Sequence, residues 1–243
     1  MRSGIALEYT SGMIPELNAD IGEGCDDAAL MPYLDRASIA CGGHAGDAAS
    51  MAVALDLCRQ HGVIPGAHPS YPDRANFGRI PLTAPPEKIC RWVIEQTETL
   101  LELAACRGQT LAHLKPHGAL YNAAAREPEI AEAIAAAVAT LDRSLILIGL
   151  ADSASLDAGR AAGLRVMAEA FADRGYRFDG NLVPRGTPGD LLDAAAAAAQ
   201  ARAIQSGQPL ACGRVINADT LCLHSDTPDA TAIASAVATA LRG

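Results

Sequence analysis

The chain has 243 residues, of which 50% are hydrophobic and 4% aromatic, and its formal net charge at pH 7 is -9. This acidic balance argues against a nucleic acid or an anionic membrane as a partner, because both bind basic patches. The seven cysteines are scattered without a CxxC pair, which argues against a disulfide framework and a cysteine-rich zinc site.

No apolar run reaches the roughly 18 residues that cross a bilayer, and the first residues lack the pattern of a signal peptide. We therefore expect a cytoplasmic protein. Residues 1–12 show no hydrophobic period, so we interpret them as a flexible leader ahead of a natural start at Met13. Residues 13–243 are expected to form a single catalytic domain, of a length that is normal for an α/β barrel.

The first predicted strand begins at Leu17 and alternates apolar and polar residues. Asn18 and Asp20 share one face of this strand, since successive side chains point to opposite sides. Two glycines then permit a tight turn that returns Glu23 to the same end. A carboxamide and two carboxylates at a glycine-rich strand end indicate a site.

Two further short strands end in loops that carry ionisable residues. Residues 37–43 lead into a glycine-rich loop with His44, and Asp47 is placed to cap a helix over residues 48–61. Residues 63–68 run into a proline-rich loop that contains His68, Asp73 and Arg79. Long loops of this kind are usually functional, and the planar guanidinium of Arg79 suits a carboxylate or a phosphate.

A long helix from Pro85 or Pro86 to Cys106 precedes the most informative stretch, residues 111–122. His113, Lys115 and His117 alternate there and would project from one face. Burying three ionisable groups in a row is costly unless they have partners, so the row predicts a site. The chain contains only one other lysine, Lys88.

The second half repeats the pattern of helices and strands. A helix over residues 128–141 and an apolar strand over 144–150 precede an alternating strand, 164–172, that places Glu169 and Asp173 on one face. Arg174 and Arg185 lie in the loops that follow, ahead of a helix over 189–206. A last strand, 220–224, ends in His224, with a final helix from Thr227. Asp226 is either the cap of that helix or a site residue.

About seven strands separated by helices predict a parallel sheet that closes into a distorted seven- or eight-stranded (β/α) barrel. A doubly wound open sheet is the second choice. The sequence contains neither GxGxxG nor a P-loop motif. A barrel would gather all the strand ends on one face, so that five of the six histidines, His44, His68, His113, His117 and His224, converge there.

Several motifs together resemble the A-subunit family of bacterial 5-oxoprolinases (LamB/YcsF type): Leu-Asn-Ala-Asp-Ile-Gly-Glu, Ala-Cys-Gly-Gly-His-Ala-Gly-Asp, Gly-Ala-His-Pro-Ser-Tyr-Pro-Asp, Lys-Pro-His-Gly-Ala-Leu-Tyr-Asn, Glu-Ala-Phe-Ala-Asp-Arg-Gly-Tyr and Val-Pro-Arg. The resemblance runs from Met13 to near Gly243. It implies a barrel related to glycoside hydrolases and polysaccharide deacetylases, ATP-dependent opening of 5-oxoproline to glutamate, and partner subunits B and C. A homo-oligomer is compatible with it.

The sequence departs from the family pattern at four positions. The family tends to carry a bulky residue at Gly43, a glycine at Asn76, an arginine at Ile80 and a glycine at Ser225. We expect these changes to affect pocket walls, and therefore substrate fit, rather than the reaction type.

Opening a stable lactam by way of carbonyl phosphorylation needs a base for water, cations for the phosphate and an acid for the departing nitrogen. Asp20, His68 or His117 can be the base, and Lys115 with Arg79 or Arg174 can hold the anions. The predicted catalytic residues are Asp20, His44, His68, Lys115, His117 and Glu169. The predicted substrate-binding residues are Asn18, Glu23, Asp73, Arg79, His113, Tyr121, Asp173, Arg174, Arg185 and His224. ATP is expected as a co-substrate of the complex, and no metal ligand is assigned.

Three alternatives remain open from the sequence. A metal-dependent deacetylase or amidohydrolase would use His113 and His117 with Asp20 or His44 as ligands of zinc or manganese. A thiol mechanism at Cys41 or Cys222 is weaker, because both cysteines fit packed strands. A non-catalytic subunit would only present the small-molecule substrate to its partners.

Overall fold

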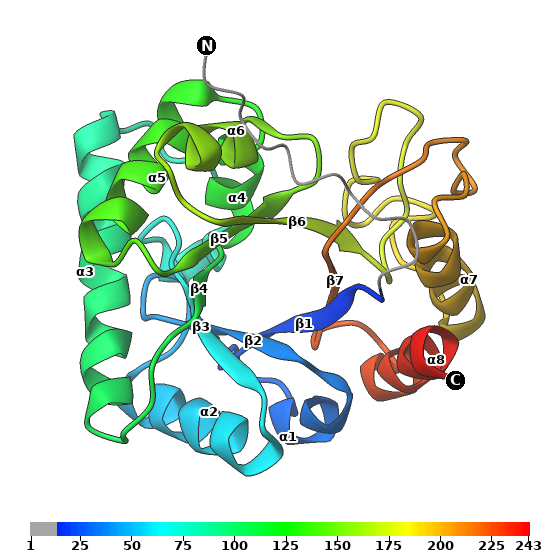
Figure 1. Cartoon of the computed structure of the whole chain (residues 1–243), viewed down its shortest axis with the longest axis horizontal. Helices are drawn as coiled ribbons and strands as arrows, with labels where there is room; N and C mark the ends of the chain where they lie inside the picture. Colours follow the sequence, from blue (N-terminus) through cyan, green and yellow to red (C-terminus); the bar gives the residue numbers. More distant parts are fainter. Residues whose placement is uncertain (1–13) are drawn as a thin grey trace.

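The computed structural model describes residues 14–243, and in that range seven parallel strands close into a barrel (Figure 1). This confirms the predicted barrel and excludes the open sheet. The strands are β1 (Glu16–Ile21), β2 (Arg36–Ala40), β3 (Ile64–His68), β4 (His113–Leu114), β5 (Ile146–Leu150), β6 (Val166–Phe171) and β7 (Thr220–Leu223). They follow one another around the barrel in sequence order, and β1 closes the ring by pairing with β7. The expected leader, residues 1–12, lies outside the described residues.

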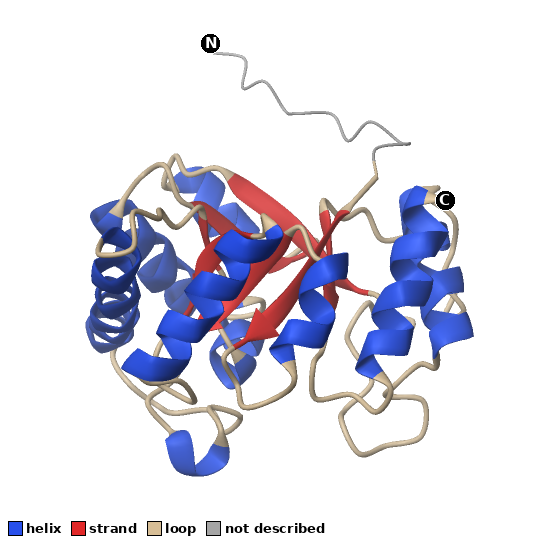
Figure 2. Ribbon diagram, turned by 90° about the horizontal axis from the view of Figure 1, so that it is seen from below, coloured by secondary structure: helices blue, strands red, loops and turns tan. Residues whose placement is uncertain are grey.

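Helices surround the barrel and cover the outward faces of the strands (Figure 2). They are α1 (Asp27–Leu30), α2 (Ala48–His61), α3 (Pro86–Ala105), α4 (Gly118–Ala124), α5 (Pro128–Leu141), α6 (Ala154–Ala161), α7 (Ala194–Gln205) and α8 (Ala230–Arg242). Two 3-10 turns, η1 (Met31–Tyr33) and η2 (Arg74–Asn76), lie in the loops. No helix of the described range is long and apolar enough to span a membrane.

Local sequence signals explain where several helices begin. Asp47 forms a capping box with Ser50 at the start of α2, as predicted. Prolines occupy the first turns of α3 and α5, where a missing N–H costs nothing, and both helices have the predicted bounds to within a residue. These helices present buried faces to the strands, so capping and packing act together.

The structure corrects three predicted boundaries and contains three short helices that were not predicted. Strand β4 has only two residues, because Pro116 ends the strand and Gly118, at φ 55°, begins a short helix that the sequence-based prediction missed. Helices α1 and α6 were also missed. Helix α7 begins at Ala194 instead of Gly189, whose φ of 84° is not helical. Helix α8 begins at Ala230 instead of Thr227, because Asp229 adopts a φ of 59°.

Candidate functional site

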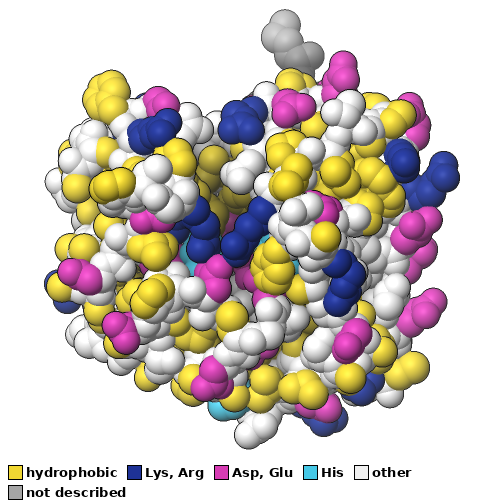
Figure 3. Space-filling model, turned by 180° about the vertical axis from the view of Figure 1, so that it is seen from behind, with side chains coloured by type: hydrophobic (Ala, Val, Ile, Leu, Met, Phe, Trp, Pro, Cys, Tyr) yellow, Lys and Arg dark blue, Asp and Glu magenta, His cyan; other side chains and the backbone are white. Residues whose placement is uncertain are grey.

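A cavity of about 600 Å³ opens at the carboxyl ends of the strands. Figure 3 shows basic side chains gathered around a hollow, with acidic and histidine side chains deeper inside it. Residues from the ends of β1, β3, β4, β6 and β7 line this cavity. Those predicted from the sequence are Asp20, Glu23, His68, Arg79, Lys115, His117, Tyr121, Arg174, Arg185 and His224. The barrel therefore brings together ten of the sixteen predicted site residues.

Lys115 occupies the centre of the cavity floor, and its side chain is almost wholly buried. Its ammonium group lies 2.8 Å from Asp20 Oδ1 and 2.8 Å from Glu169 Oε1. It also donates hydrogen bonds to Asn18 Oδ1 at 3.0 Å and to Cys222 Sγ at 3.2 Å. One cation thus connects groups on β1, β6 and β7 from inside the barrel.

Burial and charge act in opposite directions on Lys115 and Asp20. Burial lowers the pKa of Lys115, but the charges of Asp20 and Glu169 outweigh it and hold the pKa well above its ordinary value. Burial raises the pKa of Asp20, but His68 and Lys115 hold it well below its ordinary value. Both groups are therefore charged at neutral pH.

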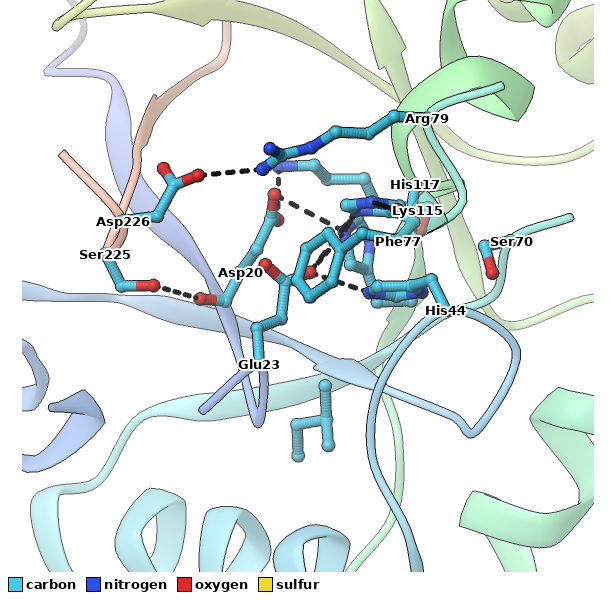
Figure 4. A network of polar contacts seen from close by, with 12 residues as sticks. Asp20, Glu23, His44, Ser70, Phe77, Arg79, Lys115, His117, Ser225 and Asp226 are labelled. Carbon is cyan, nitrogen blue, oxygen red and sulfur yellow. Dashed lines mark hydrogen bonds and ion pairs between the residues drawn. The ribbon is translucent and has the colours of Figure 1, made fainter. Parts of the chain in front are cut away.

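Three histidines and a carboxylate form a compact cluster beside Lys115, and Figure 4 shows Glu23, His44 and His117 pointing toward one another. His68 Nε2 lies 3.0 Å from His117 Nδ1. Glu23 Oε1 lies 2.7 Å from His44 Nε2, 3.3 Å from His117 Nδ1 and 3.7 Å from His68 Nε2. The ligand atoms of all four residues lie within 4.8 Å of one another, which a metal ion requires.

The protonation tendencies of this cluster differ between its members. Burial lowers the pKa of His44 to about 4, although the hydrogen bond with Glu23 opposes that change. Burial also lowers the pKa of His68, but the charge of Asp20, its hydrogen bond and the charge of Glu23 outweigh it and leave the pKa raised. Burial raises the pKa of Glu23, yet hydrogen bonds from His117 and His44 hold it below its ordinary value.

Arginines from separate loops form the rim of the cavity. Arg79 donates to Asp226 at 2.8 Å, and Arg185 contacts the same carboxylate at 3.2 Å (Figure 4 shows the first pair). Arg174 donates to the carbonyl groups of Asp190 and Val183, and Arg177 also lines the cavity. Asp226 therefore joins the loops after β3, β6 and β7, and it does not cap α8.

Asp173, just after β6, holds His224, just after β7, at the wall of the cavity. The Asp173 carboxylate accepts from the His224 ring at 2.9 Å and from the His224 backbone N–H at 2.9 Å. The imidazole stacks on Phe171 with ring centroids 5.5 Å apart and an interplanar angle of 11°. Burial raises the pKa of Asp173, but the charge and hydrogen bonds of His224 leave it below its ordinary value.

Six predicted site residues do not line the cavity: Asn18, His44, Asp73, His113, Glu169 and Asp173. Asn18, His44, Glu169 and Asp173 hold residues that do line it. His113 is fully buried beneath the floor, where its Nε2 lies 3.2 Å from Ser38 Oγ, and it is not part of the Glu23 cluster. Asp73 caps η2 and accepts from Asn76. The alternative ligand set built on His113 is therefore wrong.

The sequence-based prediction missed several residues at the cavity. Arg126, Arg177 and Asn181 line it, and the Phe77 carbonyl accepts from His117 Nε2. Single arginines in loops gave no signal that separates these from surface residues. The backbone contact of Phe77 depends on its left-handed conformation, φ 55°, which the sequence does not indicate.

The four departures from the family pattern do not line the cavity, contrary to the expectation. A Cβ atom at Gly43 would lie 2.2 Å from Gln96 Oε1, so the Gln96 side chain fills the space there. Ile80 is exposed, and Asn76 belongs to the cap of η2. Ser225 Oγ donates to the Asp20 carbonyl at 3.4 Å.

The chain matches the model of the LamB/YcsF family over residues 15–243. It is 47% identical to the protein of Chloroflexus aggregans that is named as the A subunit of 5-oxoprolinase, with 91% of this chain and 92% of that protein covered. It is also similar to the crystal structure of the lactam utilization protein from Thermus thermophilus, with a TM-score of 0.87 and 39% identity. That match covers 94% of this chain and 96% of the other.

Proposed function

The chain belongs to the LamB/YcsF family, and on that basis we propose that it is one component, the A subunit, of a 5-oxoprolinase, which opens the ring of 5-oxoproline to give glutamate. The relative from Chloroflexus aggregans is named as that component of a 5-oxoprolinase, and the similar Thermus protein is named for lactam utilization. 5-Oxoproline is a five-membered lactam with a carboxylate, so both names point to the same chemical class.

The observation that carries the proposal is the position of three residues of the cavity floor, Asp20, Lys115 and His117, beneath a rim of arginines. A small anionic lactam needs a cation for its carboxylate, and Arg174 or Arg185 offers one at the rim. The reacting carbonyl would then lie over Lys115. A cavity of about 600 Å³ also leaves room for a phosphoryl group beside the lactam.

The floor offers the groups that ring opening requires. Phosphorylation of the lactam oxygen makes the ring carbon electrophilic. A base, Asp20 or His117, takes a proton from the attacking water, and Lys115 stabilises the developing negative charge. When the bond between the ring carbon and nitrogen breaks, the nitrogen needs a proton, which the raised pKa of His68 suits it to donate. This leaves an acyl phosphate of glutamate, and a second water molecule hydrolyses it to glutamate and inorganic phosphate.

ATP is the proposed phosphoryl donor, and subunits B and C are the proposed partners. The sequence contains no P-loop. We assign nucleotide binding to the assembled complex, with the arginine rim of this chain facing the transferred phosphoryl group. Arg79 and Arg185 share Asp226 as a counter-ion, so a phosphate that displaced this carboxylate would find two guanidinium groups already placed.

The test is glutamate release from 5-oxoproline by the purified chain with ATP, with and without subunits B and C. Glutamate that requires ATP and the partners, and that falls at least a hundredfold in Asp20→Asn, would support the proposal. The matched control is His61→Ala, because His61 is an exposed histidine of α2, away from the cavity. Full activity of Asp20→Asn would favour a chain that only presents the substrate.

A second candidate, an amidohydrolase that uses a metal ion and no ATP, is favoured by the Glu23, His68 and His117 cluster. It predicts cleavage of simple amides or acetylated sugars by the isolated chain, lost on treatment with a chelator. Glutamate formation that depends on ATP would exclude it as the main reaction.

A further inference from the structure

We propose that Glu23, His68 and His117 bind a divalent transition-metal ion of the zinc class at the floor of the cavity. Zinc sites that keep an open position commonly use three protein ligands, and two histidines with one glutamate is one such set. All three residues line the cavity, so a fourth position would face its interior. The proposal concerns binding and is tested without the 5-oxoprolinase reaction. A bound ion would use His68 Nε2 and His117 Nδ1, so the acid and base roles proposed for these histidines apply to the ion-free chain, and Asp20 remains as the base when the ion is bound.

The spacing of the ligand atoms fits one ion. Metal–ligand distances of about 2.0–2.2 Å in a tetrahedron place the ligand atoms about 3.3–3.6 Å apart. The three separations here are 3.0 Å for His68 Nε2 to His117 Nδ1, 3.3 Å for His117 Nδ1 to Glu23 Oε1, and 3.7 Å for His68 Nε2 to Glu23 Oε1. An ion would enter with movements of a few tenths of an ångström.

The outer ring nitrogens of both histidines point to backbone carbonyl groups. His68 Nδ1 lies 2.7 Å from the Lys115 carbonyl, and His117 Nε2 lies 3.0 Å from the Phe77 carbonyl. A carbonyl oxygen only accepts, so these two nitrogens carry the protons. In the neutral rings, His68 Nε2 and His117 Nδ1 then direct lone pairs at each other over 3.0 Å. Two facing lone pairs need a cation or an added proton between them.

Neighbouring groups fix the orientation of the three proposed ligands, as hydrogen-bond partners do in known metal sites. Carbonyl acceptors on the far side of ligating histidines fix the tautomer and the ring orientation. His44, which does not line the cavity, lies 2.7 Å from Glu23 Oε1, the oxygen offered to the ion, and its hydrogen bond fixes the position of that oxygen. His44 stacks on His117 with centroids 3.6 Å apart, which holds the His117 ring in place.

The local charge balance also favours a cation. Glu23, Asp20 and Glu169 bring three carboxylates to the floor, and Lys115 is the ammonium group between two of them. Its charge is compensated by Asp20 and Glu169, each at 2.8 Å, so it does not oppose a metal ion beside Glu23. Asp20 Oδ2, at 3.3 Å from His68 Nε2, adds negative charge next to the open position.

The experiment is titration of the full chain, first stripped with a chelator, with Zn²⁺ and with Co²⁺, followed by calorimetry and by visible absorption. We expect one equivalent per chain. Glu23→Gln, which keeps the side-chain shape, should weaken binding at least tenfold, and His68→Ala with His117→Ala should abolish it. His61→Ala is the matched control and should bind as the unaltered chain does. Thermal melting of each apo variant establishes that it folds.

Anomalous scattering from crystals soaked in Zn²⁺ would locate the ion between Glu23, His68 and His117. The proposal is overturned if the unaltered chain binds neither ion in the micromolar range. In that case a proton, and not a metal ion, lies between His68 Nε2 and His117 Nδ1. It is also overturned if Glu23→Gln and the double variant bind normally. Thiolate-to-cobalt charge-transfer bands would also overturn the proposal, because they would show that the ion binds a cysteine such as the exposed Cys106.

Discussion

Asp20 on β1 and Glu169 on β6, the two strands that flank β7, face the same ammonium group, that of Lys115. A buried ion pair contributes little net stability compared with an apolar core, but removal of one partner leaves the other buried and uncompensated. The identity of residue 115 therefore matters for folding as well as for chemistry. This residue was recognisable in the sequence because it stands in a row with two histidines.

Replacing Lys115 with methionine should lower the free energy of unfolding by about 3–5 kcal/mol, because two carboxylates then lose their shared cation in a buried site. Urea denaturation at pH 7 measures the change. Lys88→Met is the matched control: Lys88 is exposed and lies over the Trp92 ring, so its loss should cost less than about 1 kcal/mol. If Lys115→Met and Lys88→Met lowered the free energy of unfolding equally, Lys115 would not be the shared cation of two buried carboxylates.

Asp173→Asn should show its effect in the pH dependence of stability. The folded pKa of Asp173 is lowered, so its contribution is present above the unfolded pKa of about 3.9 and is lost as the pH falls through the folded value. The unaltered chain should therefore exceed the variant in unfolding free energy by about 1–3 kcal/mol near pH 6, and the difference should shrink below pH of about 4. Asp56→Asn, at an exposed pair with Arg59, should give little difference at either pH.

If the difference in unfolding free energy between Asp173→Asn and the unaltered chain stayed constant from pH 6 to pH 3, the effect would come from the shape of the side chain and not from its charge.

The sequence indicated only part of the role of Asp173. Its place at a strand end predicted a site residue, but its partner, His224, is 51 positions away, and only the closed barrel brings the two together.

At the level of secondary structure elements, the loop after β2 packs against α3 through Gly43 and Gln96. Gln96 accepts from the Ser70 N–H at 2.9 Å and donates to the Ser70 carbonyl at 2.8 Å. This glutamine occupies the space that a side chain at residue 43 would need. The glycine, the glutamine and the loop after β3 therefore form one packed unit.

Gly43→Ala should lower the unfolding free energy by about 1–3 kcal/mol, because its Cβ would overlap Gln96 and Ser70. In a chain that already carries Gln96→Ala, the added cost of Gly43→Ala should fall substantially. Denaturation of the parent, the two single variants and the double variant gives the coupling energy. Additivity within about 0.5 kcal/mol would show that the two positions do not compete for space.

The elements differed in how well their sequences specified them. Helices α3 and α5 begin at prolines and have long apolar faces, so their bounds were predictable. Strand β4 was not, because two residues give no period and its chemistry lies in the turn after it. Helix α7 was placed five residues too early, since the antiparallel bridge between Arg174 and Leu191 holds the preceding segment out of the helix.

On the scale of the whole molecule, Asp226 ties the loop after β3 to the long segment between β6 and α7. Its two ion pairs join residues 147 and 41 positions apart in the chain. The order of the strands and the closed ring were predictable from the alternation of strands and helices. The loop-to-loop contacts were not, because charged residues in loops have no period that identifies their partners.

Asp226→Ala should increase the rate of tryptic cleavage after Arg185 by a factor of about 2 to 30, as two exposed ion pairs of about 0.2–1 kcal/mol each are lost. Timed digestion with mass spectrometry measures the rate. Asp157→Ala removes the exposed pair with Arg160 on α6 and should leave cleavage at Arg185 unchanged. Unchanged cleavage in Asp226→Ala would mean that other contacts hold this segment.

The Lys115 contacts also bear on the order in which the molecule assembles. Lys115 reaches Asn18 and Cys222, which are 97 and 107 positions away, so these bonds require the first, middle and last strands to be in place. Loop-closure entropy delays such contacts until most of the chain is organised. Interactions absent from the transition state change the rate of unfolding far more than the rate of folding. We therefore expect Lys115→Met to raise the rate of unfolding far more than it lowers the rate of folding.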